Sequence, residues 1–141
     1  MLASVLLNSV WKICMIDALF NQTDYVAAKK QLDAISLRED AIASNIANLE
    51  TPGYKRLDVS ASFNAEFQRA CAARDPQAIA ALKPELEVDP NAVPVSPDGN
   101  TVSLEDELLK MNQNSLANTL ETQLVSTDLY RLKMAITGTV S

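Results

Sequence analysis

The sequence predicts an all-α protein, in which long N- and C-terminal helices pair as an antiparallel coiled-coil-like hairpin around a short irregular middle region. Hydrophobic residues make up 48% of the 141 residues but aromatic residues only 5%, so the core must be built from aliphatic side chains and alanine. That composition favours helix-on-helix packing over a β-sandwich. With three glycines, the chain also has few positions suited to tight β-hairpin turns.

The first strong helical pattern runs from about Asp24 to Leu49. Positions at alternating steps of three and four residues are apolar or aromatic except for Glu39, and this period keeps one stripe of a helix against a partner. Asp24 can cap the start, and Pro52 ends the helix because the residue before a proline avoids helical geometry. The stripe consists of Tyr25, Ala28, Leu32, Ile35, Glu39, Ile42, Ile46 and Leu49.

The middle of the chain, residues 57–100, is its most acidic part, and we expect it to be the most solvated. Residues 62–73 predict a short amphipathic helix. Residues 74–84 predict another, with Asp75 as its cap and Pro76 at the first helical position. Residues 84–100 contain repeated prolines and an Asp-Gly pair, which predict loop or extended chain. A short edge strand near Glu87–Val88 is compatible with those prolines.

The last element runs from about Leu104 to Thr137. Ser103 and Asp106 form an N-terminal capping pattern, and Gly138 ends the helix. At about 100° per residue, its apolar side chains gather on two different sides, so we expect this helix to meet more than one neighbour. One side holds Leu109, Leu116, Leu120 and Leu124, and the other holds Val125, Leu129, Leu132 and Ile136.

Between Met111 and Thr127 the only charged residue is Glu121, and the polar residues are uncharged amides and hydroxyls. Two interpretations remain open for this stretch. Uncharged polar side chains can pair across a packed interface without the cost of burying charge. The alternative is a mildly polar helix surface that faces solvent.

The chain lacks the residue types on which most enzyme sites depend. It has no histidine and two cysteines, too few ligands for a structural zinc site, and it lacks the commonest general base. Glu39, Asp40 and Glu50 are interpreted as a solvated helix face. The acids at 105–107 are explained as partners of a helix dipole. We therefore expect no enzymatic activity, no cofactor, no metal and no small-molecule substrate.

The charge and the cysteines leave other questions partly open. The formal net charge is −6 and no long basic stripe is present, which argues against nucleic-acid binding. Cys14 and Cys71 could form one disulfide, but free thiols are favoured.

Residues 1–14 are apolar but have no basic region before the apolar part, as a signal peptide would. The run is also far shorter than the roughly 20 residues that span a bilayer. A weak membrane-surface segment is one interpretation. A second is that residues 1–14 are an extension and that translation starts at Met15, so that Trp11 and Cys14 have no role.

An aromatic residue and two cations, Tyr54, Lys55 and Arg56, follow the helix stop. In one interpretation they form a local turn in which Tyr54 packs on its own helix. In the other they form a rigid corner that docks on a neighbouring subunit, because tyrosine and arginine are both favoured at interfaces. The second interpretation is preferred here.

These residues resemble a known family. Residues 15–20 and 32–56 are similar to the N-terminal signature of flagellar rod, hook and hook-associated proteins, and residues 93–136 resemble the proximal rod members in particular. Together the resemblance covers roughly residues 15–137. Its most specific part is the turn motif, with Ser44, Asn45, Ala47, Asn48, Thr51, Pro52, Gly53 and Tyr54.

The resemblance implies a structural role in the bacterial flagellar basal body. Proteins of this family pair their terminal helices into a coiled coil that lines a hollow tube, and the rod crosses the periplasm and transmits motor torque. The implied partners are other rod proteins and basal-body components, copies of the chain itself, and the flagellar type III export apparatus, which exports subunits without a cleaved signal peptide. The alternative is a cytoplasmic helical adaptor or flagellar export chaperone.

The chain then divides into an extension (1–14), an N-terminal helix with its turn (15–56), a middle with short helices and a proline-rich loop (57–100), and a C-terminal helix (101–141). We expect the isolated chain to be monomeric and partly disordered at both ends. The residues assigned to the assembly seam are Leu32, Ile35, Ile42, Ile46, Leu49, Leu116, Leu120, Leu124, Leu129, Leu132 and Ile136.

Overall fold

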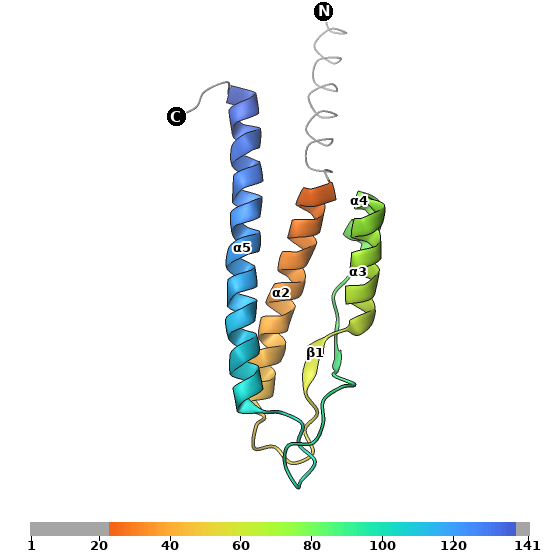
Figure 1. Cartoon of the computed structure of the whole chain (residues 1–141), viewed down its shortest axis with the longest axis vertical. Helices are drawn as coiled ribbons and strands as arrows, with labels where there is room; N and C mark the ends of the chain where they lie inside the picture. Colours follow the sequence, from red (N-terminus) through yellow and green to blue (C-terminus); the bar gives the residue numbers. More distant parts are fainter. Residues whose placement is uncertain (1–22, 138–141) are drawn as a thin grey trace, which may run out of the picture.

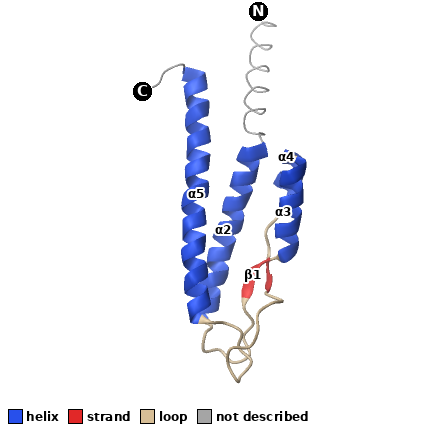
Figure 2. Ribbon diagram, in the orientation of Figure 1, coloured by secondary structure: helices blue, strands red, loops and turns tan. Residues whose placement is uncertain are grey.

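The structure, a computed structural model, describes residues 23–137 (Figure 1). Residues 1–14 and Met15 lie outside this range, so the structure does not test the expectations for the extension and for the start of translation. It does not test the expected disorder at the two ends either. The predicted helical class is confirmed (Figure 2). In chain order the elements are α2 (Thr23–Ala47), β1 (Leu57–Val59), α3 (Ala61–Ala73), α4 (Pro76–Ala81), β2 (Leu86–Val88) and α5 (Leu104–Thr137).

The central helix is α2, which has neighbours on two sides (Figure 1). It contacts α5 on one side and β1, β2 and α4 on the other. The longer α5 begins beside the C-terminal end of α2 and extends past the first described turn of α2 (Figure 1). Among the described residues, no helix is both long enough and apolar enough to cross a bilayer.

Packing on two sides explains how α2 departs from the predicted single stripe. Its buried apolar residues are two adjacent pairs, Ala34–Ile35 and Ala41–Ile42, so that one residue of each pair can face each neighbour. Glu39, which falls on the predicted stripe, is exposed. The helix ends at Ala47, slightly before the predicted Leu49, because the chain there enters a series of turns.

The middle region is more ordered than predicted. β2 confirms the short strand near Glu87–Val88, but its antiparallel partner β1 was missed. The paired residues are Leu57 with Val88, Asp58 with Glu87, and Val59 with Leu86. Three residues are too short a run for alternation to be recognised in the sequence.

Both short helices of the middle are confirmed, and each has an identifiable cap. Ser60 caps α3 by accepting a hydrogen bond from Phe63 N, and Asp75 caps α4 by accepting from Gln77 N and Ala78 N, with Pro76 in the first turn as expected. Buried Val59 and Phe63 pack with Ala34, and half-buried Phe67, Leu82 and Leu86 complete this small core.

The C-terminal helix is α5, Leu104–Thr137, which agrees with the predicted range, and the predicted stop at Gly138 lies outside the described residues. The predicted cap is confirmed, because Ser103 Oγ accepts a hydrogen bond from Asp106 N at 3.3 Å. Before it, the loop from Asp89 to Ser103 returns the chain to the end of α2 (Figure 1).

Candidate functional site

The turn motif at the end of α2 is used to build the chain's own junction. Asn45 is fully buried, and its side chain contacts β1. Its Nδ2 donates to Leu57 O at 2.9 Å, while its Oδ1 accepts from Leu57 N at 2.9 Å. The amide of Asn45 therefore pairs with the outer edge of β1 as a neighbouring strand would, which ties α2 to the sheet.

The rest of the motif is held by local and long-range hydrogen bonds. The Tyr54 hydroxyl shares a hydrogen bond with Ser44 Oγ at 3.1 Å and donates to Asn45 Oδ1 at 3.4 Å. Asn48 Nδ2 donates to Ser44 O at 2.8 Å, and Thr51 Oγ1 donates to Asn48 Oδ1. Tyr54 thus packs on its own helix, as the first of the two interpretations stated.

Asn100 closes the end of α2 from the far side of the middle region. Its Nδ2 lies 3.0 Å from both Asn48 O and Leu49 O and 2.9 Å from Thr51 O, and its Oδ1 accepts from Val102 N. These three carbonyl groups belong to the turns that follow α2, and the Asn100 side chain supplies them with a donor. The left-handed φ of +82° at Gly99 helps to turn the chain into this position.

Arg56 is the centre of a buried ion cluster that joins three parts of the chain. Its side chain is 5% exposed, and its three nitrogens donate to three different carboxylates. Nε lies 2.7 Å from Glu107 Oε1 in α5, Nη1 lies 2.6 Å from Asp89 Oδ2 after β2, and Nη2 lies 2.8 Å from Asp58 Oδ2 in β1. The planar guanidinium presents donors in three directions and can make all three hydrogen bonds at once, whereas a compact ammonium group fits this arrangement less well.

The carboxylates of this cluster have further partners. Glu107 is fully buried, and its other oxygen accepts from Asn45 Nδ2 at 3.1 Å. Asp58 Oδ1 accepts from Arg38 Nε at 3.1 Å and from Val59 N at 2.7 Å. The turn motif and the ion cluster therefore share Asn45 and Glu107 and form one polar network.

The cluster shifts the pKa of both partners toward their charged forms. Burial raises the pKa of Asp58, but hydrogen bonds from Arg56, Val59 N and Arg38 outweigh burial and hold the pKa below its ordinary value. Burial lowers the pKa of Arg56, but its bonds to Asp58 and Glu107 outweigh this and raise it. Both groups are charged at neutral pH.

Two interpretations drawn from the sequence are wrong here. Arg56 cannot belong to an exposed docking corner, because it is buried and neutralised within the chain. Lys55 is exposed, but its Nζ donates to Gly99 O at 2.8 Å. The helix dipole does not account for Glu107, which is the buried partner of Arg56, whereas Glu105 and Asp106 are exposed acids in the first turn of α5.

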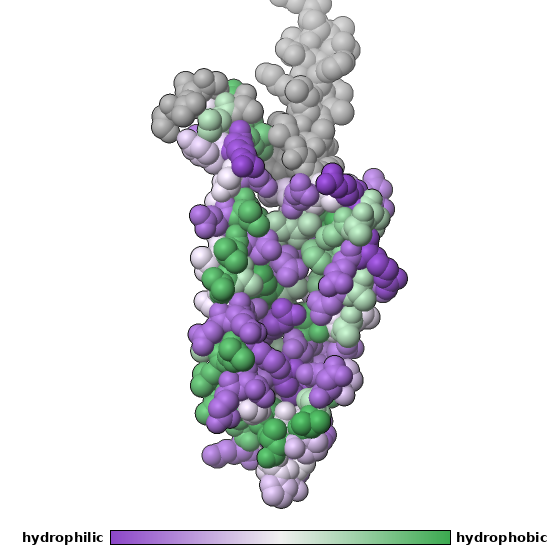
Figure 3. All heavy atoms as spheres, in the orientation of Figure 1, coloured by the Kyte–Doolittle hydropathy of each residue, from purple (hydrophilic) through white to green (hydrophobic). Residues whose placement is uncertain are grey.

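The assembly seam predicted on α5 lies on the exposed surface of the folded chain. Leu116 is 62% exposed, Leu120 54% and Leu124 56%. Hydrophobic patches run along α5 in the surface view of Figure 3. Leu129 and Ile136 are also exposed, whereas Leu132 is half-buried. On α2 the predicted seam residues are more covered: Ile35 and Ile42 are buried, and Leu32, Ile46 and Leu49 are half-buried.

The uncharged polar stretch of α5 combines features of both earlier interpretations. Asn114 is buried against α2, and its Nδ2 donates to Ile35 O at 3.0 Å. Most other members of the stretch are exposed. An open surface depression of about 440 Å³ is lined by Ser115, Asn118, Thr119, Thr122 and Gln123.

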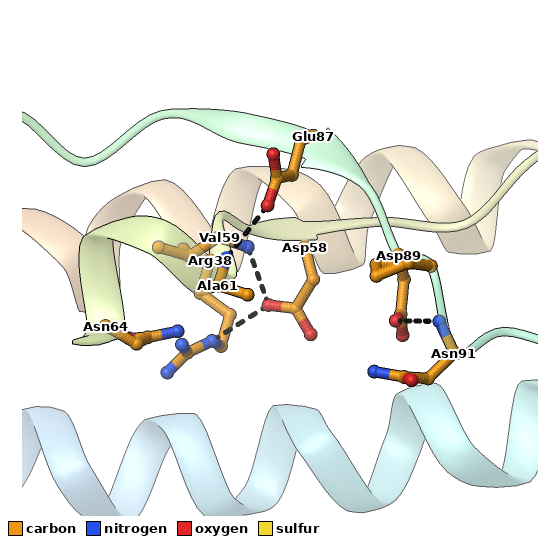
Figure 4. Close-up of a pocket in the computed structure, with 9 residues that line it drawn as sticks. Arg38, Asp58, Val59, Ala61, Asn64, Glu87, Asp89 and Asn91 are labelled. Atoms are coloured by element: carbon orange, nitrogen blue, oxygen red, sulfur yellow. Dashed lines mark hydrogen bonds and ion pairs between the residues drawn. The ribbon is translucent and has the colours of Figure 1, made fainter.

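The cavity beside the ion cluster is small and polar, at about 240 Å³ (Figure 4). Its acidic side chains already have partners within the chain. Glu87 accepts from Ala61 N, and Asp89 accepts from Asn91 N and Arg56. Within residues 23–137, no group of histidine, cysteine or acidic side chains is placed to hold a metal ion, and Cys71 is a free, half-buried thiol.

Comparison with known proteins identifies the family. Residues 27–55, which include the whole turn motif, match the family model described as flagella basal body rod protein. The chain is 30% identical to the flagellar basal body rod protein FlgB of Borrelia hermsii, over 69% of this chain and 83% of the relative. It is 28% identical to the FlgB of Borreliella burgdorferi (strain ATCC 35210 / DSM 4680 / CIP 102532 / B31), over 67% of this chain and 82% of the relative. The chain therefore belongs to the flagellar basal body rod protein family, and it is FlgB-like.

Proposed function

We propose that this chain, a structural subunit of the flagellar basal body rod, assembles helically with copies of itself and with other rod proteins through the exposed apolar side of α5. Such an assembly forms a hollow drive shaft in the periplasm that transmits torque and conducts exported subunits. The chain itself reaches the rod through the flagellar type III export apparatus, without a cleaved signal peptide. It has no catalytic activity in this proposal.

The exposed leucines of α5 carry the proposal. Leu116, Leu120 and Leu124 are each more than half exposed in the folded chain. Fully burying one leucine side chain is worth about 1.5–3 kcal/mol, so a row of them supplies a large part of the free energy of a subunit contact. Contacts between unlike surfaces that do not close into a ring generate helical filaments, which is the geometry a rod requires.

The finer arrangement is also part of this proposal. α2 and α5 pair as an antiparallel coiled-coil-like hairpin in the assembled rod. Supporting this, Asn45 bonds to Glu107 while Ile35, nearer the start of α2, bonds to Asn114, farther along α5. The half-buried seam residues of α2, Leu32, Ile46 and Leu49, become fully buried when subunits stack.

A matched pair of substitutions tests the proposal. Leu120→Asp places a charge in the exposed row of α5, whereas Thr119→Asp places the same charge on a neighbouring exposed position outside the row. We expect cells that carry Leu120→Asp to lose motility and basal bodies to lack the subunit, and cells that carry Thr119→Asp to swim. Incorporation of Leu120→Asp into detergent-extracted basal bodies at the normal level would refute the proposed contact.

The alternative, a cytoplasmic adaptor or export chaperone, receives no support from the comparisons. Cell fractionation distinguishes the two functions. A rod subunit co-purifies with detergent-extracted basal bodies, whereas a chaperone stays with its client in the cytoplasm.

A further inference from the structure

The helix α5 is inverted relative to an ordinary amphipathic helix. Among its described side chains, those buried most deeply against the rest of the chain are polar, with Glu107 0% and Asn114 5% exposed. Leu116 and Leu120 point to solvent instead. At 100° per residue, Leu116, Leu120 and Leu124 lie about 170°, 130° and 90° around the helix from the side that carries Glu107 and Asn114. The hydrophobic effect alone favours the opposite orientation, with the leucines on α2.

Specific polar contacts hold α5 in this orientation. The Glu107 carboxylate accepts from Arg56 Nε at 2.7 Å and from Asn45 Nδ2 at 3.1 Å. One heptad later, Asn114 Nδ2 donates to Ile35 O at 3.0 Å. The two donors to Glu107 are themselves held in place. Asp58 and Asp89 hold Arg56, and β1 holds Asn45. Glu107 can therefore accept hydrogen bonds from both donors in one rotational setting of α5 only.

We propose that the contacts of Glu107 and Asn114 form a rotational lock, which keeps the apolar side of α5 facing outward in the single folded chain. When α5 is rotated to place its leucines on Ile35 and Ile42 of α2, Glu107 leaves Arg56 and the buried cation loses one of its three carboxylates. The inference goes beyond the structural role in the rod. It concerns the isolated chain and holds whether or not subunits assemble.

The unsatisfied atom of Asn114 supports this interpretation. Its Oδ1 is buried and has no hydrogen-bond partner in the described part of the chain. A buried acceptor without a donor destabilises the fold, so this position is not optimised for stability. Buried polar residues at helix–helix contacts are known to select one arrangement at a cost in stability, and a rotational lock has that property.

Single-cysteine reporters on the full-length chain test the lock. In a background with Cys14→Ser and Cys71→Ser, Leu120→Cys reports on the outward side and Val125→Cys on the side toward α2. Without further change, the thiol at 120 should react rapidly with a maleimide and the thiol at 125 slowly. Arg56→Met leaves Glu107 buried without its cation, so that the orientation with the leucines inward becomes favoured. The reaction at 120 should then slow by about tenfold, equivalent to about 1.4 kcal/mol, while the reaction at 125 accelerates.

A second variant and a matched control complete the experiment. Asn114→Asp places a buried carboxylate against Ile35 O without altering Arg56, and it should also protect the thiol at 120. Arg38→Met is the control, because the Arg38 guanidinium also contacts Asp58 but does not contact Glu107. It should leave the reaction rates of the thiols at 120 and 125 unchanged. The lock is overturned if the thiol at 120 stays rapid in both Arg56→Met and Asn114→Asp. Protection of that thiol to the same degree in Arg38→Met would overturn it as well.

Discussion

Asn45→Ala tests the central junction of the fold most simply. The substitution removes the two hydrogen bonds that Asn45 makes with Leu57 and the one that it donates to Glu107. Three groups are then left without this partner, Leu57 N, Leu57 O and Glu107 Oε2, while the Tyr54 hydroxyl loses its bond to Asn45 Oδ1 but keeps Ser44 Oγ. At about 1–2 kcal/mol for each buried group left unsatisfied, we expect a loss of about 3–6 kcal/mol in the free energy of unfolding.

That loss is large compared with the stability of an ordinary domain, which is about 5–15 kcal/mol. Urea denaturation followed by far-ultraviolet circular dichroism measures it by linear extrapolation. Asn64→Ala is the control, because Asn64 is an exposed asparagine in α3. Equal unfolding free energies for Asn45→Ala and Asn64→Ala would refute the role given to Asn45.

Three further predictions follow from the cluster and the seam. Arg56→Lys should lower the free energy of unfolding, measured by urea titration, by about 2–4 kcal/mol, because an ammonium group cannot reach all three carboxylates and a broken buried pair costs about 3–5 kcal/mol. Arg131→Lys is the control: it alters an exposed ion pair and should change the free energy of unfolding by less than about 1 kcal/mol. The pKa of Asp58 in the folded chain lies below its unfolded value of about 3.9, so its contribution to stability is complete above about pH 5 and is lost as the pH falls. Asp58→Asn should therefore flatten the acid side of a plot of unfolding free energy against pH. An unchanged acid side would argue against the lowered pKa. Ile46→Asp should abolish assembly and swimming because it places a charge at a half-buried seam position, and normal swimming would count against the seam.

The sequence predicted the helices well because their signals are local. The cap at Ser103, the cap at Asp75 and the bounds of α5 all depend on residues within one helical turn, and all three are confirmed. The turn after α2 was also expected from Pro52 and Gly53. Local signals therefore gave most of the secondary structure.

The polar network was missed because its partners are distant in the sequence. Arg56 and Glu107 are 51 residues apart, and Asn45 and Glu107 are 62 apart. The sequence alone predicts Arg56 to be an exposed cation after a turn and Glu107 to be an ordinary acid in a first helical turn. Only the return of the chain through the middle region brings the two together, and no local period encodes that return.

The same limit explains the orientation of α5. Helical periodicity groups Leu116, Leu120 and Leu124 on one side, but it could not decide whether that side faces α2 or solvent. The buried contacts of Glu107 and Asn114 decide it in the folded chain. The placement of the leucines outside the fold supports a contact with another subunit.

Electron microscopy of isolated basal bodies, at a resolution that shows the side chains of this subunit, tests the central claim most directly. We expect the chain in a helical arrangement in the rod, with Leu116, Leu120 and Leu124 buried against a neighbouring subunit. A rod in which those three side chains face solvent, or in which this chain is absent, would contradict the account.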